Sequence, residues 1–151
     1  MTNPDPEPSA GWLEEATHVF PVRVYYEDTD FSGVVYHANY LRFMERGRSE
    51  FLRLAGAGHQ GLLATPEPLV WAVRRMGIDF RKPARMDDAL TIRTAVRELA
   101  GARMRLDQAV LRGRDVLVQA EVEVCIITLD GRPRRVPDST RNKLEFFLKS
   151  P

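Results

Sequence analysis

Apolar and polar residues alternate along much of the chain, and the first such run begins near His18. Residues 22–26 place valines on either side of an arginine before a pair of tyrosines. A period of two residues is typical of a strand with one buried face. Residues 27–33 are polar and contain a glycine, so we expect a loop after this strand.

Residues 39–55 follow a different pattern, because their apolar positions recur at spacings of three and four with charged residues between them. This spacing predicts a long amphipathic helix with one face to bury. The apolar positions are Tyr40, Phe43, Met44, Gly47, Phe51, Leu54 and Ala55. Glycine in a helix interior costs roughly 1 kcal/mol relative to alanine, so Gly47 suggests that another backbone approaches closely. Gly56 and Gly58 are expected to end the helix.

The part of the chain after this helix reads mainly as strands joined by short turns. The expected strands are 76–81, 90–97, 103–111 and 116–129, with a short one at 134–136. A last helix is expected with Asp138 or Ser139 as its cap and Leu144, Phe147 and Leu148 on its apolar face. The connections are too short for parallel crossovers, so the pattern predicts an α+β fold with an antiparallel sheet and one long helix.

The length of 151 residues fits a single domain. Prolines at positions 4, 6 and 8 make helix or ladder pairing unfavourable at the start. We therefore expect residues 1–12 to form a disordered tail and residues 13–151 to form one domain.

Charge and cysteine content exclude several classes of protein. The chain has 22 Lys and Arg against 21 Asp and Glu, so its net charge of +1 gives no general reason to expect a nucleic acid partner. No stretch approaches the roughly 20 apolar residues of a membrane span, and residues 1–7 do not resemble a secretory signal. With Cys125 as its single cysteine, the chain can form neither an intrachain disulfide nor a cysteine-based zinc site. These features favour a cytoplasmic protein.

The segment YYEDTDFSGVVYHANY, residues 25–40, places two carboxylates, a glycine and a histidine between a strand end and a helix start. Amides at a helix N-terminus can polarise a carbonyl, and Asp30 could supply a nucleophile or base for it. Asp28 and Asp30 could equally be turn formers or helix caps. Of the three histidines, only His37 lies in this segment, while His18 and His59 look like ordinary surface or loop residues.

This segment resembles the signature of the 4-hydroxybenzoyl-CoA thioesterase family of hotdog proteins. Residues 21–53 are most similar to its bacterial branch associated with the Tol-Pal system. The residues that carry the resemblance in one register are Asp28, Asp30, Gly33, Tyr36, Asn39 and Tyr40. The resemblance implies a hotdog fold, in which an antiparallel sheet of five or six strands wraps around one long central helix.

Carried over by position, the resemblance makes Asp30 the catalytic carboxylate and the amide of His37 the donor that polarises the carbonyl. The implied substrate-binding residues are Gly33, Tyr36, Arg103 and Arg105, the two arginines meeting the phosphates of coenzyme A. The hydroxybenzoyl enzymes commonly have tyrosine where this chain has His37, which argues against a hydroxybenzoyl substrate.

The implied activity is hydrolysis of an acyl-coenzyme A thioester, with Asp30 as nucleophile or general base. No metal or cofactor is expected, since coenzyme A is part of the substrate. A homodimer or homotetramer is expected, because the strand at 116–129 and its neighbours leave an apolar edge to cover.

Other functions are compatible with the same sequence features. The fold could serve a non-catalytic acyl-CoA-binding or regulatory protein, or an interaction protein of an envelope complex. A hotdog hydratase is disfavoured because its aspartate and histidine motif is missing, and a serine hydrolase because no G-x-S-x-G occurs.

Overall fold

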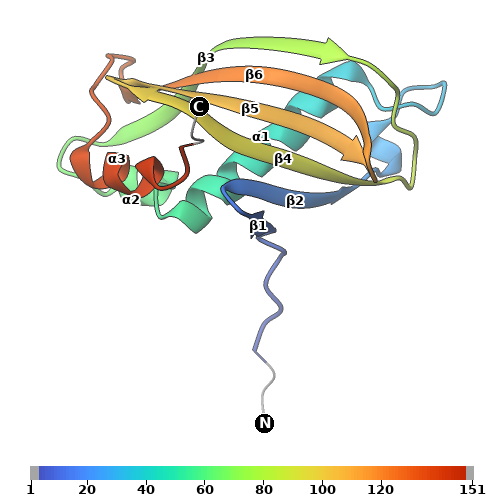
Figure 1. Cartoon of the computed structure of the whole chain (residues 1–151), viewed down its shortest axis with the longest axis horizontal. Helices are drawn as coiled ribbons and strands as arrows, with labels where there is room; N and C mark the ends of the chain where they lie inside the picture. The colour runs from blue at the N-terminus through green and yellow to red at the C-terminus, as the bar shows by residue number, and fades with distance from the viewer. Residues whose placement is uncertain (1–3, 149–151) are drawn as a thin grey trace.

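The computed structural model describes residues 4–148 of the chain. Its six strands form one antiparallel sheet in the order β1-β2-β4-β5-β6-β3, and helix α1 runs beneath the arch of this sheet (Figure 1). The elements are β1 (Trp12–Glu14), β2 (Thr17–Arg23), the 3-10 turn η1 (Tyr26–Asp28), α1 (His37–Ala55), α2 (His59–Leu63), β3 (Leu69–Phe80), β4 (Ala89–Ala100), β5 (Arg103–Arg112), β6 (Asp115–Thr128) and α3 (Asp138–Glu145). The predicted α+β hotdog architecture is confirmed.

The core lies between the apolar face of α1 and the helix-facing side chains of the sheet. Phe43, Met44 and Phe51 of α1 are fully buried. Gly47 is where the sheet comes nearest, because a Cβ added there would lie 2.7 Å from Cγ2 of Ile92 on β4. The close approach expected at Gly47 is therefore real, but the neighbour is the Ile92 side chain and not a backbone.

Several boundaries differ from the prediction. Order begins before His18, since β1 starts at Trp12 and pairs with β2. The helix α2 was not predicted at all, and residues 134–136 form no strand. Instead the amide of Arg134 donates to the carbonyl of Ile126 at 2.9 Å.

The final helix buries Leu144 and Phe147 as expected. Its cap residue is Pro137, with no side-chain capping bond in the described chain, so the expectation that Asp138 or Ser139 caps it is wrong. Of the predicted tail, residues 1–3 lie outside the described residues, and residues 4–10 have no helix or strand. The disorder of the tail and the single-domain division stay predictions.

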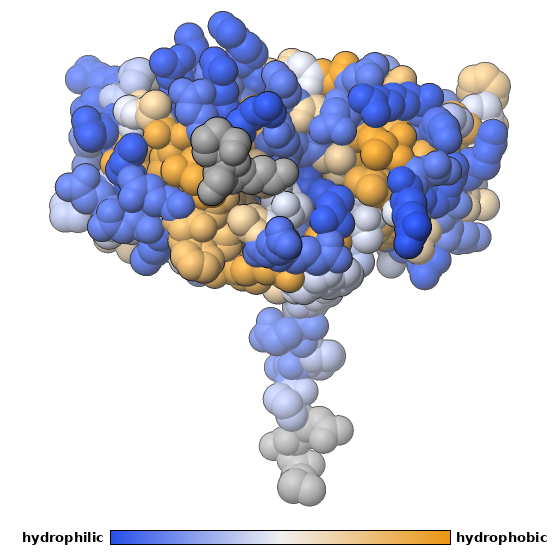
Figure 2. All heavy atoms as spheres, viewed as in Figure 1, coloured by the Kyte–Doolittle hydropathy of each residue, from blue (hydrophilic) through white to orange (hydrophobic). Residues whose placement is uncertain are grey.

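Strand β3 forms one edge of the sheet, and β6 lies between β5 and β3. The strand at 116–129 is thus paired on both sides, and its neighbour β3 is the edge strand on that side of the sheet. Helix α1 packs against β2, β4 and β5, while Val73 and Phe80 of β3 remain about half exposed. Hydrophilic side chains cover much of the opposite, outer face of the sheet, with apolar areas between them (Figure 2). No helix within residues 4–148 is long and apolar enough to cross a membrane.

His18 is fully buried on β2, so its interpretation as a surface or loop residue was wrong. Its Nε2 lies 2.8 Å from the carbonyl oxygen of Ala10, which requires the proton on Nε2. The other ring nitrogen, Nδ1, is buried without a partner among the described residues. Burial accordingly lowers the pKa of His18 below its ordinary value. The neutral imidazole holds the segment before β1 against the sheet.

This burial predicts a loss of stability in mild acid. In the unfolded chain a histidine binds a proton near pH 6.5, whereas folded His18 binds one only at lower pH. The contribution of His18 to the free energy of unfolding is therefore fully present above pH 6.5 and is lost as the pH falls below it. We expect the melting temperature to fall less between about pH 7.5 and about pH 5.5 in His18→Gln than in the wild type. The exposed His59→Gln serves as control. Identical pH dependence in wild type and His18→Gln would contradict this account.

Candidate active site

The loop between β2 and α1 folds back on itself around Asp30. The amide of Asp30 donates to the carbonyl of Val34 at 2.9 Å, and the amide of Gly33 donates to the carbonyl of Asp30 at 3.0 Å. Gly33 has φ +83, a left-handed conformation that side chains rarely adopt. No described atom lies within 4 Å of a Cβ built there, so the space beside Gly33 is open. The role of Gly33 in substrate binding stays a prediction.

Asp28 holds the loop against the start of α1. Its carboxylate is buried and accepts two hydrogen bonds of 2.8 Å, one from the amide of Tyr25 and one from Nδ2 of Asn39. Its carbonyl also accepts from the amide of Tyr36 at 3.0 Å. Asp28 therefore has the structural role that the sequence left open for both aspartates.

The segment after β3 fixes the other side of the loop. The amide of Val35 donates to the carbonyl of Ala84 at 2.9 Å, and the amide of Ala84 donates to the hydroxyl of Tyr40 at 2.9 Å. Ala84 is fully buried and Tyr40 nearly so. The loop, the helix start and the rim of the sheet thus form one hydrogen-bonded unit.

Asp30, in contrast to Asp28, is reached by solvent. Its Oδ1 accepts from the amide of Ser32 at 2.8 Å and from the hydroxyl of Ser32 at 2.5 Å. These two bonds favour the charged form and lower the pKa of Asp30 below its ordinary value. Within residues 4–148 no donor is bound to Oδ2. Asp30 is therefore ionised at neutral pH with one carboxylate oxygen free.

The start of α1 presents backbone donors next to this loop. The amide of Asn39 donates to the carbonyl of Tyr36 at 2.8 Å, but the amides of His37 and Ala38 have no acceptor in the described part of the chain. A helix N-terminus with free amides attracts negative charge. The imidazole of His37 is exposed, with its centroid 4.5 Å from the Tyr36 ring and 6.3 Å from the Phe80 ring.

An open pocket of about 260 Å³ adjoins these amides. Its lining residues are Val35, His37, Tyr40, Phe80, Arg81, Lys82 and Pro83. Its walls combine the aromatic residues Tyr40 and Phe80 with the cationic residues Arg81 and Lys82. Such a pocket can receive an apolar group whose polar end points at the helix start.

Arg103 and Arg105 do not belong to this pocket within one chain. Both arginines lie at the start of β5. The other end of β5 is near the pocket, because Arg112 donates to the carbonyl of the lining residue Pro83 at 3.3 Å. At about 3.3 Å per residue, Arg103 lies roughly 30 Å along the strand from Arg112. The structure therefore unites Asp30, Gly33, Tyr36 and His37 and leaves the two arginines apart.

Arg103 and Arg105 instead surround Glu123 on the outer face of the sheet. Glu123 Oε1 lies 3.2 Å from Arg105 Nε and 3.7 Å from Arg103 Nη1, and its Oε2 lies 2.7 Å from Arg74 Nη1. The bond from Arg74 is the main cause of the lowered pKa of Glu123. A bulge between Val73 and Arg75 leaves Arg74 out of the ladder. An alternating sequence pattern does not reveal such a bulge, so the position of Arg74 could not be predicted from it.

The comparisons with known proteins agree with this geometry. The family model of the thioesterase-like superfamily matches residues 24–144. The chain belongs to the thioesterase-like superfamily. This match covers the loop with Asp30, the whole of α1 and the sheet from β3 to β6.

Individual thioesterases of this superfamily are similar over most of the chain. The acyl-CoA thioester hydrolase YbgC of Escherichia coli O6:H1 is 43% identical over 122 residues, which are 80% of this chain and 90% of that protein. The acyl-CoA thioesterase YbgC of Haemophilus influenzae is 44% identical over 110 residues, 73% of this chain and 80% of that protein. The solved structure of a probable thioesterase from Bartonella henselae has a TM-score of 0.77 and 50% identity, and it covers 80% of this chain and 99% of that one.

These findings confirm two predictions. The chain is a thioester hydrolase, and its relatives are of the YbgC type, the branch associated with the Tol-Pal system. The roles of individual residues stay predictions. Across residues 4–148 the thioesterase has no group of three or more His, Cys, Asp or Glu side chains that could hold a metal.

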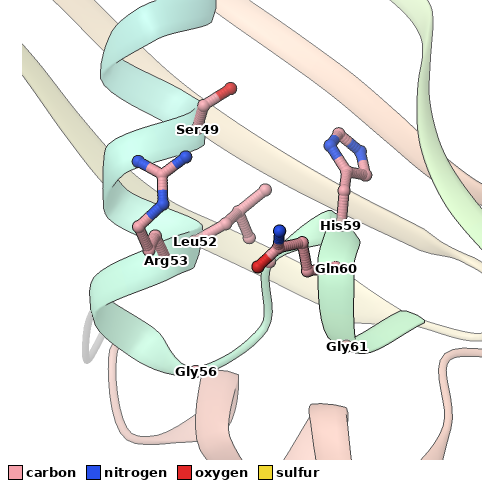
Figure 3. Close-up of a pocket in the computed structure, with 8 residues that line it drawn as sticks. Ser49, Leu52, Arg53, Gly56, His59, Gln60 and Gly61 are labelled. Atoms are coloured by element: carbon pink, nitrogen blue, oxygen red, sulfur yellow. The ribbon is translucent and has the colours of Figure 1, made fainter. Parts of the chain in front are cut away.

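A second cavity, of about 450 Å³, lies where α1 ends and α2 begins. Ser49 and Arg53 of α1 face His59 and Gln60 of α2 across it (Figure 3). Arg53 is ion-paired with Glu50. The cavity lies at the opposite end of α1 from the Asp30 loop, so the thioesterase site is better placed at the helix start.

The hydrogen bonds of Ser32 predict a pH effect. Ser32→Ala removes the hydroxyl that favours ionised Asp30, so the pKa of Asp30 should rise. If the ionised carboxylate is the active form, the acidic limb of kcat/KM for thioester hydrolysis moves to higher pH in this variant. The control Ser139→Ala, exposed on α3, should keep the limb in place. If the acidic limb of kcat/KM stays at the same pH in Ser32→Ala, the activity does not depend on the ionisation of Asp30.

Proposed function

We propose that this thioesterase hydrolyses an acyl-coenzyme A thioester to the free acid and coenzyme A, with Asp30 acting on the carbonyl. The observation that supports this most is the pairing of an ionised, accessible Asp30 with the free amides of His37 and Ala38. Its similarity to acyl-CoA thioester hydrolases gives the substrate class.

The amides would act on the oxygen of the thioester. As a nucleophile attacks the carbonyl carbon, negative charge moves onto this oxygen. The His37 amide, at the N-terminus of a 19-residue helix, would stabilise this charge. The imidazole of His37 is not required for this role. The aromatic rings of Tyr36 and Phe80 would flank the bound acyl group.

Asp30 can act on the carbonyl in either of two roles. As a nucleophile, its free Oδ2 bonds to the carbonyl carbon and the carbon–sulfur bond breaks, which gives an anhydride that water then hydrolyses. As a general base, it takes a proton from water, and the hydroxide attacks the same carbon. In both cases the leaving thiolate, with a parent pKa of about 8.5, departs without a strong acid.

The phosphates of coenzyme A would bind the basic cluster of Arg74, Arg103 and Arg105 around Glu123. This assignment needs a second subunit, since the cluster is far from Asp30 along the sheet of one chain. A homodimer paired antiparallel along the β3 edges would bring the start of one β3 beside the Phe80 end of the other. A tetramer built from such dimers is equally compatible with this scheme.

A non-catalytic acyl-CoA-binding protein is the alternative. It would use the same pocket but would have no need of an ionised carboxylate beside the carbonyl. A role in an envelope complex has no surface in the described chain to support it. Cytoplasmic location and independence from a metal or cofactor stay predictions.

Replacement of the carboxylate tests the proposal. Asp30→Asn keeps the shape and removes the charge, so kcat on acyl-CoA should fall at least about 100-fold with little change in melting temperature. The assay is a panel of acyl-CoAs with a free-thiol reporter, run with and without a chelator. Asp138→Asn, exposed on α3, is the matched control and should keep its turnover. Near-normal turnover in Asp30→Asn would contradict the mechanism. If the wild type hydrolyses none of the acyl-CoAs, the proposed substrate class is wrong.

A further inference from the structure

Arg48 is a buried cation in the middle of α1. Its side chain is only 9% exposed, and its Nη1 donates to Oε1 of Gln108 at 3.0 Å. Gln108 is fixed in turn, because its Nε2 donates to the carbonyl of Met44 at 3.0 Å and to the hydroxyl of Thr94 at 2.9 Å. This chain of bonds sets the position of the guanidinium.

The guanidinium of Arg48 forms no ion pair with any residue from 4 to 148. Thirteen ion pairs are recorded among the described residues, and none of them includes Arg48, so no described carboxylate lies within 4 Å of it. Loss of solvent lowers the pKa of Arg48, as expected for a cation removed from water, and the charge of Glu45 in the same chain opposes part of this shift. A buried charge without an opposite charge is unfavourable. Among the described residues, Arg48 therefore has Glu45 nearby but no carboxylate in direct contact.

Arg48 lines a cavity of about 190 Å³ between α1 and the edge strand β3. The other lining residues are Glu45, Ser49, Leu52, His59, Trp71, Val73, Leu106 and Val124. Glu45 precedes Arg48 by about one helical turn, so the two lie on the same side of α1. Glu45 is exposed and forms no ion pair with a described residue.

An acid and a base on one helix face suit a twofold interface. In such an interface the same patch is used by both subunits, so residue i contacts residue j of the partner and j contacts i. Two antiparallel copies of α1 would therefore match Glu45 with Arg48 twice. Trp71 and Val73 connect the cavity to β3, whose outer edge has no partner strand in the described chain.

We propose that Glu45 of a second copy of this chain enters the cavity and ion-pairs with Arg48, with the reciprocal pair formed at the same time. This inference rests on the homodimer of the proposed function and names the contact that holds its two central helices together. The partner's carboxylate would contact Arg48 directly, whereas Glu45 of the same chain lines the cavity without forming an ion pair with Arg48. Because α1 also carries the His37 amide at its start, the pair fixes the helices that present the two sites.

Substitution of the exposed member tests the pair without disturbing the core. Glu45→Lys places the partner's lysine against each Arg48, and the dimer dissociation constant should rise at least about 100-fold in analytical ultracentrifugation. Glu45→Gln removes attraction without adding repulsion and should raise it about tenfold. The matched control is Glu50→Lys on the same helix, because Glu50 pairs with Arg53 of its own chain and should leave the constant unchanged. Circular dichroism checks that each subunit stays folded.

The outcomes separate the pair from the dimer itself. If the wild-type chain is monomeric at every concentration, the dimer is wrong, and so is the ion pair between its subunits. A wild-type dimer with an unchanged dissociation constant in folded Glu45→Lys overturns the pair alone. Equal weakening by Glu45→Lys and Glu50→Lys also overturns the pair, because it would reflect the general charge of α1.

Discussion

One sheet has to bury one long helix, and most of the structure follows from this constraint. The 19-residue helix α1 has an apolar face that only a curved sheet can surround, and contact is closest where Gly47 meets Ile92. The strands β2, β4 and β5 pack against the helix, whereas β3 stays at the edge. The N-terminus of α1 then lies at the rim of the sheet, where its amides are free. The arrangement that buries the helix also exposes the end that can bind a carbonyl.

The two aspartates of the loop differ in burial and in hydrogen bonding. Asp28 is buried, and its two carboxylate oxygens accept hydrogen bonds from the amide of Tyr25 and from Nδ2 of Asn39. These bonds hold the loop against the helix. Asp30 is accessible and keeps one oxygen free, while Ser32 maintains its ionised state. A carboxylate that is fully hydrogen-bonded and buried cannot attack a substrate. The assignment of chemistry to Asp30 therefore depends on Asp28 holding the loop in place.

Features with a local cause could be predicted from the sequence. The spacing of apolar residues predicted α1 and four long strands, and Asp30 and His37 come together because they are near neighbours in the chain. Features with a tertiary cause could not. His18 is buried because β1 and the segment before it cover β2. Arg103 and Arg105 are far from Asp30 because β5 runs the length of the sheet, and the buried setting of Arg48 depends on Gln108 from β5.

The most direct test of the account is the structure of this protein with a ketone analogue of an acyl-CoA, in which a methylene replaces the thioester sulfur and prevents hydrolysis. The account predicts that the ketone oxygen lies about 2.9 Å from the backbone nitrogen of His37. It also predicts that a carboxylate oxygen of Asp30, or one water bound to it, lies about 3 to 3.5 Å from the ketone carbon. A ketone bound away from the start of α1, with Asp30 facing solvent, would contradict it.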